Sequence, residues 1–424
     1  YPNRTPHTGL LEYKNVYRPA RVVSYDENSG ELVLHNYMDF DDLKDYVEIA
    51  YEMVQDGLTV EKGILPDVSI APHSDGKAEL KLQVPALGRV YLKLEYRLKK
   101  EMPLMERGHV LGFDERKLAN EDGRNRQAVT WMEQEPVPSD ITVKETDTQI
   151  ALQAKDFCYK IDKRTGMFTQ IQFAGRDYLN GPMELNIWRA PTDNDMYIKE
   201  EWKKAHYHEA YTRAYRISTF QKQDRVLLTG RLAVVAATVQ KILDVELTWE
   251  IHGNGKISSI IAVEKEEEFP ELPRFGIRLF LDKKLETVSY FGMGPQESYR
   301  DKHRGSSHGC YCSKVSQMHE DYIRPQENGS HFDCDYVEVA NTQFGIAAVS
   351  GQPFSFNASI YTQEELERAA HNYELEEAGS TVLCIDYALN GIGSNSCGPV
   401  VLDQYRFDDA TFRFQFELVP FAKG

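Results

Sequence analysis

The chain has 424 residues, a length that suits about two to four domains. Hydrophobic residues make up 41% of it and aromatic residues 11%, which excludes a disordered chain. With 49 Lys and Arg against 66 Asp and Glu, the net charge is −17, so we expect neither nucleic acid nor a membrane among its partners. No apolar run approaches the roughly 20 residues that span a bilayer.

The chain begins at Tyr1 without an initiator methionine or a leader-like segment. We therefore expect a piece of a longer protein whose targeting signal is missing. The expected location is the cytoplasm or the periplasm. Six cysteines without a C-x-x-C motif predict reduced thiols rather than a disulfide framework.

Alternation of apolar and polar residues dominates the chain, and this period of two is typical of strands with one buried and one exposed face. Residues 47–53 and 90–98 show it clearly. About seven strands fit into residues 15–100, which is the density of an immunoglobulin-like sandwich. Residues 114–146 are charged and interrupted by prolines, so they predict an interdomain linker.

The remaining 280 residues or so again alternate, for example at 243–251 and 412–418. One helix is predicted there, at 364–371, because Thr362-x-x-Glu365 forms a capping-box pattern. A β domain of this length exceeds an ordinary sandwich, so we expect large twisted sheets packed face to face.

Two groups of histidines invite a metal-site interpretation. The larger group comprises His303, His308, Cys310, Cys312 and His319. Its spacing matches no zinc pattern, and a C-x-C pair in a strand points its thiols to opposite faces. His206 and His208 have no evident third ligand nearby. We therefore interpret both groups as loop or packing residues.

Three segments have a composition that is unusual for strands or simple turns. They are 189–195 (R-A-P-T-D-N-D), 291–301 (F-G-M-G-P-Q-E-S-Y-R-D) and 391–399 (G-I-G-S-N-S-C-G-P). None has the Lys-Ser or Lys-Thr of a phosphate loop, so nucleotide binding is not supported. Taken alone, they can be structural loops in which Asx and Arg side chains hold the backbone.

These segments resemble motifs of the large β-galactosidases of glycoside hydrolase family 2. Residues 189–195 resemble the family's R-A-P-x-D-N-D, and residues 292–301 resemble its G-x-G-P-x-E-x-Y-x-D. Residues 325–329, P-Q-E-N-G, are similar to P-x-E-N-G, and residues 8–19 are similar to the family's exit from the catalytic barrel. The resemblance extends over the whole chain.

The resemblance implies an all-β chain with an immunoglobulin-like sandwich at 1–118, a linker at 119–146 and a large galactose-mutarotase-like supersandwich at 147–424. It implies that the two catalytic glutamates and the Mg²⁺ and Na⁺ ligands lie upstream, in a barrel and a sugar-binding domain. This chain would then hold no catalytic residue and no cofactor. With 66 acidic residues, counting alone identifies no carboxylate pair.

The resemblance also implies that two loops of the last domain border the active-site cleft. Asn194 and Asp195 lie at the first loop, at the end of its motif. Asn395 and Cys397 lie in the second. Cys397 stands where the best-known family member has a tryptophan that stacks on sugar. A thiol offers no such stacking surface, so we expect the entrance to the active-site cleft to bind sugar less strongly here.

The sequence thus predicts the C-terminal, non-catalytic part of a retaining β-galactosidase that hydrolyses terminal β-D-galactosides. Its expected partners are its own upstream catalytic domains, the β-galactoside substrate of the full-length enzyme and further copies in a homo-oligomer. Two alternatives stay open. A carbohydrate-binding module without a hydrolytic role would present an exposed aromatic platform, and a mutarotase-like epimerase would need a converging His/Glu pair.

Overall fold

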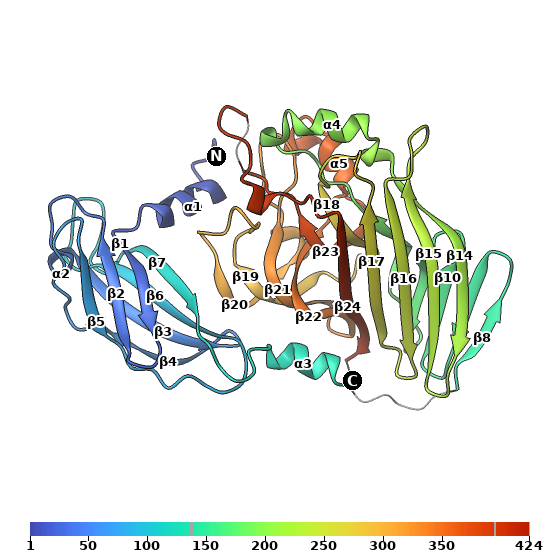
Figure 1. The fold of residues 1–424 in the computed structure, drawn as a ribbon, viewed down its shortest axis with the longest axis horizontal. Coiled ribbons are helices and arrows are strands. Elements are labelled where there is room, and N and C mark those ends of the chain that lie inside the picture. Colours follow the sequence, from blue (N-terminus) through green and yellow to red (C-terminus); the bar gives the residue numbers. More distant parts are fainter. Residues whose placement is uncertain (135–139, 394–395, 424) are drawn as a thin grey trace. The chain divides into compact units, whose positions relative to one another are not determined.

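The computed structural model describes residues 1–134, 140–393 and 396–423, and its regular structure is mostly β (Figure 1). The chain divides into two compact units. The first contains Tyr1–Val129, Gly294–Gln296 and His303–Cys310, and the second contains Thr130–Met293, Glu297–Lys302 and Tyr311–Gly424. None of the helices in the described part has the length and apolar character needed to cross a membrane.

Seven strands of the first unit form two sheets. One has the order β1-β2-β5, with β1 (Ala20–Asp26), β2 (Glu31–Asn36) and β5 (Asp75–Glu79). The other has the order β4-β3-β6-β7, with β4 (Leu58–Ile64), β3 (Val47–Gln55), β6 (Val90–Leu98) and β7 (Val110–Lys117). Leu32 and Leu34 of one sheet share a buried cluster with Leu92 and Leu94 of the other. The predicted sandwich is therefore confirmed, with its last strand ending at residue 117.

Three short helices occur where the sequence predicted none: α1 (Thr8–Val16), α2 (Leu43–Tyr46) and α3 (Arg126–Met132). The α3 helix lies inside the expected linker. The Asn125 side chain accepts hydrogen bonds from the backbone N of Gln127 and Ala128, at 3.0 and 3.1 Å, as a helix N-cap does. The Trp131 ring then packs 5.4 Å from the ring of Phe421, so this segment is anchored.

The first unit is not continuous in sequence, because residues 303–310 belong to it. His308 binds Glu115 twice: its backbone N donates to Oε2 at 2.8 Å, and its ring Nδ1 lies 2.6 Å from Oε1. The His308 ring also stacks on Tyr91 with 4.2 Å between ring centroids. A late segment of the chain therefore completes a unit that begins at residue 1.

The second unit contains a five-stranded sheet and most of a twelve-stranded sheet. The smaller has the order β12-β11-β10-β9-β8, formed by β8 (Thr142–Glu145), β9 (Gln149–Gln153), β10 (Phe157–Asp162), β11 (Phe168–Phe173) and β12 (Arg176–Asp177). The larger has the path β13-β18-β23-β22-β24-β17-β16-β15-β14, with β19, β20 and β21 attached beside it. Neighbours along that path run antiparallel.

The strands of the larger sheet are β13 (Leu179–Asn186), β14 (Tyr211–Gln221), β15 (Arg225–Val235), β16 (Leu243–His252), β17 (Ile257–Lys265), β18 (Arg274–Asp282), β19 (Thr287–Gly294), β20 (Ser307–Lys314), β21 (Ser330–Ala340), β22 (Phe344–Ser359), β23 (Ser380–Leu389) and β24 (Thr411–Ala422). The two sheets share one apolar core. Trp249 Nε1 of the larger sheet donates to Gly166 O, in a turn of the smaller, at 2.9 Å. Tyr159 OH, in β10 of the smaller sheet, donates to Gly255 O, between β16 and β17 of the larger sheet, at 2.6 Å. The all-β class is confirmed.

The described part of the second unit also contains the helices α4 (Ile198–Lys204) and α5 (Gln363–Arg368). Thr362 caps α5 as predicted, since its Oγ1 accepts from Glu365 N at 3.1 Å. The helix ends earlier than predicted, because Ala369 already has extended backbone angles. The α4 helix was not predicted, and it buries Trp202 completely. Single 3₁₀ turns occur at Asp193–Asp195, Tyr207–Glu209, Val315–Gln317, Asn372–Glu374 and Asp403–Tyr405.

Candidate functional site

The first motif is held by its own arginine. Arg189 is fully buried, and its Nη2 donates to Asp195 Oδ1 at 2.7 Å. The guanidinium also donates to two carbonyls, Asn390 O at 2.5 Å and Gly391 O at 3.1 Å. The second Asp195 oxygen accepts from Thr192 N at 2.8 Å, and only 4% of Asp195 is exposed. Asp195 therefore positions the loop, and its contact with a sugar stays a prediction.

Asn194 connects the two loops that were predicted to border the cleft. It lies half-buried in a 3₁₀ turn, and its Nδ2 donates to Ile392 O at 2.9 Å. Asp301, at the end of the second motif, holds the same stretch by accepting from Ile392 N and Gly393 N at 3.1 and 2.7 Å. A Cβ at Gly393 would lie 2.7 Å from Asp301 Oδ2, so a larger residue there would displace the Asp301 carboxylate.

The surface beside these contacts is exposed and partly apolar. Cys397 is exposed, whereas Asn395, the fourth predicted cleft residue, lies outside the described residues. Four large apolar side chains flank the two loops in sequence. Their exposed fractions are 40% for Met196, 59% for Tyr197, 67% for Val400 and 62% for Leu402. Exposed apolar side chains of this kind mark surfaces that contact another protein part or a ligand.

Glu297 joins the second motif to the third. It is 7% exposed, and its Oε1 accepts from Lys302 Nζ and from Tyr322 OH, both at 2.5 Å. Its Oε2 accepts from Gly329 N at 2.8 Å, and Gly329 ends the P-Q-E-N-G motif. Burial alone would raise the pKa of Glu297, but the Lys302 ammonium and the hydrogen bonds outweigh it, so the pKa is lowered.

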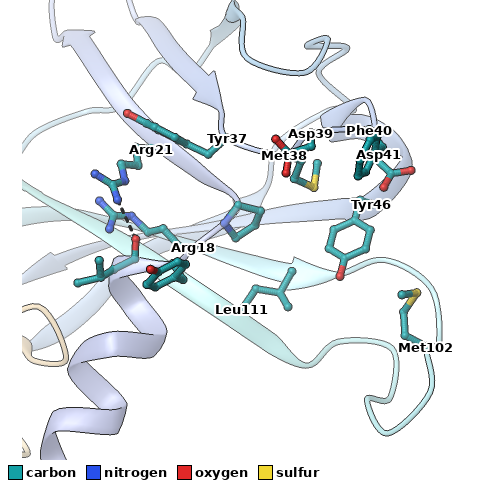
Figure 2. A pocket seen from close by; sticks show the side chains of 13 residues that line it. Arg18, Arg21, Tyr37, Met38, Asp39, Phe40, Asp41, Tyr46, Met102 and Leu111 are labelled. Atoms are coloured by element: carbon teal, nitrogen blue, oxygen red, sulfur yellow. Dashed lines mark hydrogen bonds between the residues drawn. The ribbon is translucent and has the colours of Figure 1, made fainter.

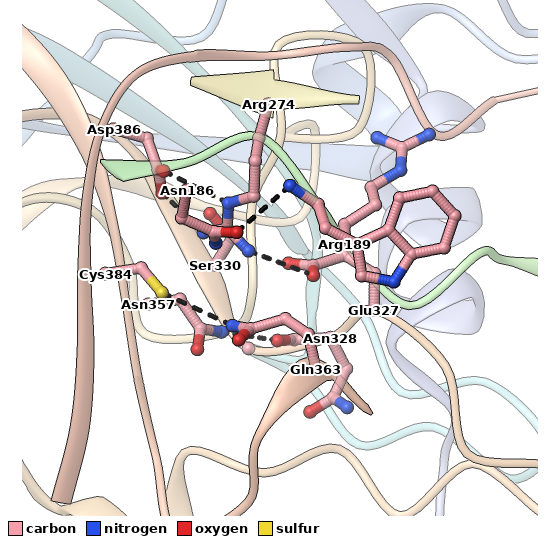
Figure 3. Close-up of polar contacts among 12 residues, drawn as sticks. Asn186, Arg189, Arg274, Glu327, Asn328, Ser330, Asn357, Gln363, Cys384 and Asp386 are labelled. Atoms are coloured by element: carbon pink, nitrogen blue, oxygen red, sulfur yellow. Dashed lines mark hydrogen bonds and ion pairs between the residues drawn. The ribbon is translucent and has the colours of Figure 1, made fainter. Parts of the chain in front are cut away.

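A buried ion-pair network lies behind the motifs (Figure 3). Arg274, at the start of β18, donates from Nε and Nη2 to Asp386 of β23, at 3.1 and 2.5 Å. Its Nη1 lies 3.3 Å from Glu327 Oε2, and the other Glu327 oxygen accepts from Tyr299 OH at 3.4 Å. Glu327 N donates to Ala190 O at 3.0 Å. Arg274 thus links the third motif to the first.

Burial raises the pKa of both Glu327 and Asp386, and the nearby Arg274 guanidinium opposes that rise. A carboxyl with a raised pKa is typical of a general acid. Glu327 is only 3% exposed and Asp386 not at all, so no sugar can reach either group. A retaining glycosidase instead needs two carboxylates about 5–5.5 Å apart that face the substrate. The network therefore fixes loops rather than transferring protons.

Arg274 and Asp386 are not among the residues predicted from the sequence. Both stand in strand sequences, P-R-F-G-I-R and C-I-D-Y, that are otherwise largely apolar. A charged residue within a buried strand needs a partner of opposite charge. The charged residues in these apolar strands therefore indicated that a buried ion pair exists. The identity of that partner was not readable, because 112 residues separate the pair.

The two histidine groups show no metal-binding arrangement among the described residues, where no three His, Cys, Asp or Glu side chains are grouped to hold an ion. Cys310 and Cys312 are exposed. His206 instead lies 3.0 Å from Glu209, three residues along the chain.

Comparison with known proteins gives consistent matches over the whole chain. Residues 153–418 match the family described as "Beta galactosidase small chain", and residues 32–119 match "Beta-galactosidase, domain 4". The chain is 43% identical to a β-galactosidase of Actinobacillus pleuropneumoniae over 420 residues, which cover 99% of this chain and 40% of that protein. It is 31% identical to one of Staphylococcus xylosus, covering 99% and 41%. The chain therefore spans about 40% of the length of these relatives.

Among solved structures, a galactose 1-epimerase from Lactobacillus acidophilus NCFM is similar to 68% of this chain and to 100% of that chain. The TM-score is 0.36 and the sequence identity 7%.

Glu297→Gln should lower the free energy of unfolding of the second unit by about 1–3 kcal/mol at neutral pH, because a buried charged acceptor is lost. A carboxylate with a lowered folded pKa contributes stability that is present above its unfolded pKa of about 4.3 and is lost as the pH falls through the folded pKa. The difference from wild type should therefore shrink in acid. Urea unfolding followed by tryptophan fluorescence measures it, since all four tryptophans lie in the second unit.

Glu286→Gln is the matched control, because Glu286 is 61% exposed and forms a surface ion pair with Lys314. That variant should differ little from wild type at any pH. If the deficit of Glu297→Gln stays constant from about pH 7 to about pH 3.5, the charge of Glu297 is not what holds the two motifs together.

Proposed function

Because the chain belongs to the β-galactosidase small-chain family, we propose that it is the C-terminal, non-catalytic part of a retaining β-galactosidase. In the whole enzyme it would wall the active-site cleft, and an upstream part would supply the two catalytic carboxylates. The substrate would be a terminal β-D-galactoside. Any Mg²⁺ or Na⁺ would bind upstream, and the whole enzyme would be a homo-oligomer.

The observation that carries this proposal is the contrast between the buried and the exposed sides of the motif region. Four of its carboxylates, those of Asp195, Glu297, Glu327 and Asp386, are buried and bound to cations, hydroxyls or backbone N–H groups. The loops that they hold carry exposed apolar side chains and the exposed thiol of Cys397. Buried, fixed carboxylates beneath exposed loop side chains are what we expect of a surface that contacts the upstream part of the enzyme.

Within this wall we assign direct contact with the sugar or its aglycone to Asn194, Asn395 and Cys397. Arg189 and Asp195 are positioning residues, since they hold the backbone from which Asn194 projects. The Asn194 Nδ2 group already donates to Ile392 O, so its Oδ1 is the atom offered to a sugar hydroxyl.

A chimera tests the proposal. The 43% identical relative keeps its own upstream part and receives this chain in place of the matched segment. The chimera should hydrolyse a chromogenic β-galactoside, whereas the chain alone should not, because half an active site gives essentially no transition-state stabilisation. Hydrolysis by the purified chain alone would refute a non-catalytic role. A folded but inactive chimera would refute the assignment as a cleft wall.

Cys397 allows a second test, by alkylation of the chain followed by mass spectrometry. Its exposed thiol should react readily, whereas the fully buried Cys384 should not, because burial raises the pKa of the Cys384 thiol to about 11. In the chimera, Cys397→Trp should lower KM about two- to tenfold by adding a stacking surface, with fold stability unchanged.

The matched control is Ser396→Trp, at the neighbouring exposed position. If Ser396→Trp changes KM as much as Cys397→Trp does, or if neither changes it, Cys397 does not face the cleft. If Cys397 resists alkylation, its side chain belongs to the protein interior.

A carbohydrate-binding module is the second candidate, and one observation favours it. A cavity of about 810 Å³ in the first unit is bordered by aromatic side chains, with Phe40 and Tyr46 on one side and Tyr37 with Arg21 on the other (Figure 2). Phe40 is 93% exposed and Tyr37 47%. One face of Tyr37 is covered, because the Arg21 guanidinium lies 4.7 Å from its ring centroid.

If the module interpretation holds, calorimetry should detect lactose binding to the chain, and Phe40→Ala should abolish it. Phe220→Ala, which changes a 63% exposed ring of the second unit, is the control and should leave binding intact. Absence of heat with lactose, or equal loss in both variants, would reject a sugar platform at Phe40.

A further inference from the structure

A separate cavity of about 330 Å³ lies within the second unit. It is lined by parts of β13 and β14, by Arg278 of β18 and by Glu364 of α5. Of the predicted cleft residues that the structure describes, Asn194, Asp195 and Cys397 do not line it. Its volume lies at the lower end of the roughly 300–1,000 Å³ range of small-molecule sites, so it suits a compact ligand.

One end of this cavity is polar and fixed. Arg278, 8% exposed, donates from Nη2 to Glu184 Oε2 at 2.7 Å and from Nη1 to Glu364 Oε1 at 2.8 Å. The two glutamates are 45% and 53% exposed, so each carboxylate retains lone pairs that can accept from a hydroxyl. Among the described residues, the lining carries three carboxylates, including Asp162, and one guanidinium, that of Arg278. This charge balance disfavours an anion.

The buried amide of Asn186 lies at the cavity wall, and only one of its two polar atoms has a partner among the described residues. Asn186 is 5% exposed, and its Oδ1 accepts from Trp188 N at 3.0 Å. Its Nδ2 makes no hydrogen bond within the part of the chain that the structure describes. A buried donor without an acceptor is unfavourable, so an oxygen-bearing ligand would satisfy it.

The other walls are apolar and aromatic. Met183, Ile187 and Trp188 line the cavity from positions that are at most 4% exposed. Tyr211, at the start of β14, also lines it and is 55% exposed. An exposed aromatic ring at the rim offers a flat apolar face, while its hydroxyl stays in water.

We propose that this cavity is a second sugar site, which binds a neutral monosaccharide. The C–H face of the pyranose would pack on Tyr211 and the apolar wall. Its hydroxyls would donate to Glu184 and Glu364 and accept from Asn186 Nδ2. This site is independent of the cleft role proposed above, since it lies wholly within the second unit and needs no upstream part.

Nuclear magnetic resonance of the ¹⁵N-labelled chain tests the site with D-galactose and D-glucose as probes. The indole N–H signals come from only four tryptophans, and Trp188 is the one among them that lines the cavity. The Trp188 indole signal should shift saturably with at least one sugar, and the Trp131 signal should not move. If neither sugar shifts Trp188 saturably, or if sulfate shifts it as strongly, the proposal is wrong.

Two variants with matched controls locate the binding. Tyr211→Ala should weaken the affinity about three- to tenfold, whereas Tyr215→Ala, on the same strand and 56% exposed, should not. Glu184→Gln should weaken it similarly, whereas Glu266→Gln, with a 44% exposed ion-paired carboxylate outside the cavity, should not. Equal losses in a variant and its control would overturn the assignment. Phe40→Ala should leave the Trp188 response intact, which separates this site from the first-unit candidate.

Discussion

Arg274 places a permanent positive charge where water does not reach, and the surrounding elements are arranged to offset it. Removing a guanidinium from water is unfavourable unless carboxylates replace the lost hydration in good geometry. Asp386 supplies two hydrogen bonds from the neighbouring strand, and Glu327 supplies a second negative charge from a loop. Glu327 also binds the backbone of Ala190, so satisfying this one charge fixes a strand pair and two motif segments together.

This arrangement separates the residues that hold the site from those that can meet a ligand. The acidic side chains that make the motifs conspicuous in the sequence, such as Asp195 and Glu297, are used internally. What reaches the surface is less distinctive: an amide at Asn194, a thiol at Cys397 and apolar side chains on either side. A surface of this kind can change its preference for a ligand through single substitutions, because the buried network under it stays unchanged.

Local patterns in the sequence predicted the strands of the fold correctly, but not the helices α1 to α4. The period-two strands, the sandwich near the N-terminus and the Thr362 cap of α5 were all found, and the family resemblance was confirmed. The short helices were missed because α3 and α4 are stabilised by contacts distant in sequence, such as Trp131 with Phe421 and Trp202 with Glu271 O. Arg274 was missed for the same reason. The resemblance placed Asp195 at the cleft, and its hydrogen bonds to Arg189 and Thr192 became visible only in the structure.

The discontinuity of the first unit has a consequence for the order in which the protein is made. Residues 303–310, including the His308 that binds Glu115, leave the ribosome long after residues 1–129. Domains commonly fold during synthesis in order from the N-terminus, but this unit stays incomplete until more than half of the second has emerged. The contacts of His308 with Glu115 and with the Tyr91 ring therefore form only late in synthesis, after residue 308 has been made.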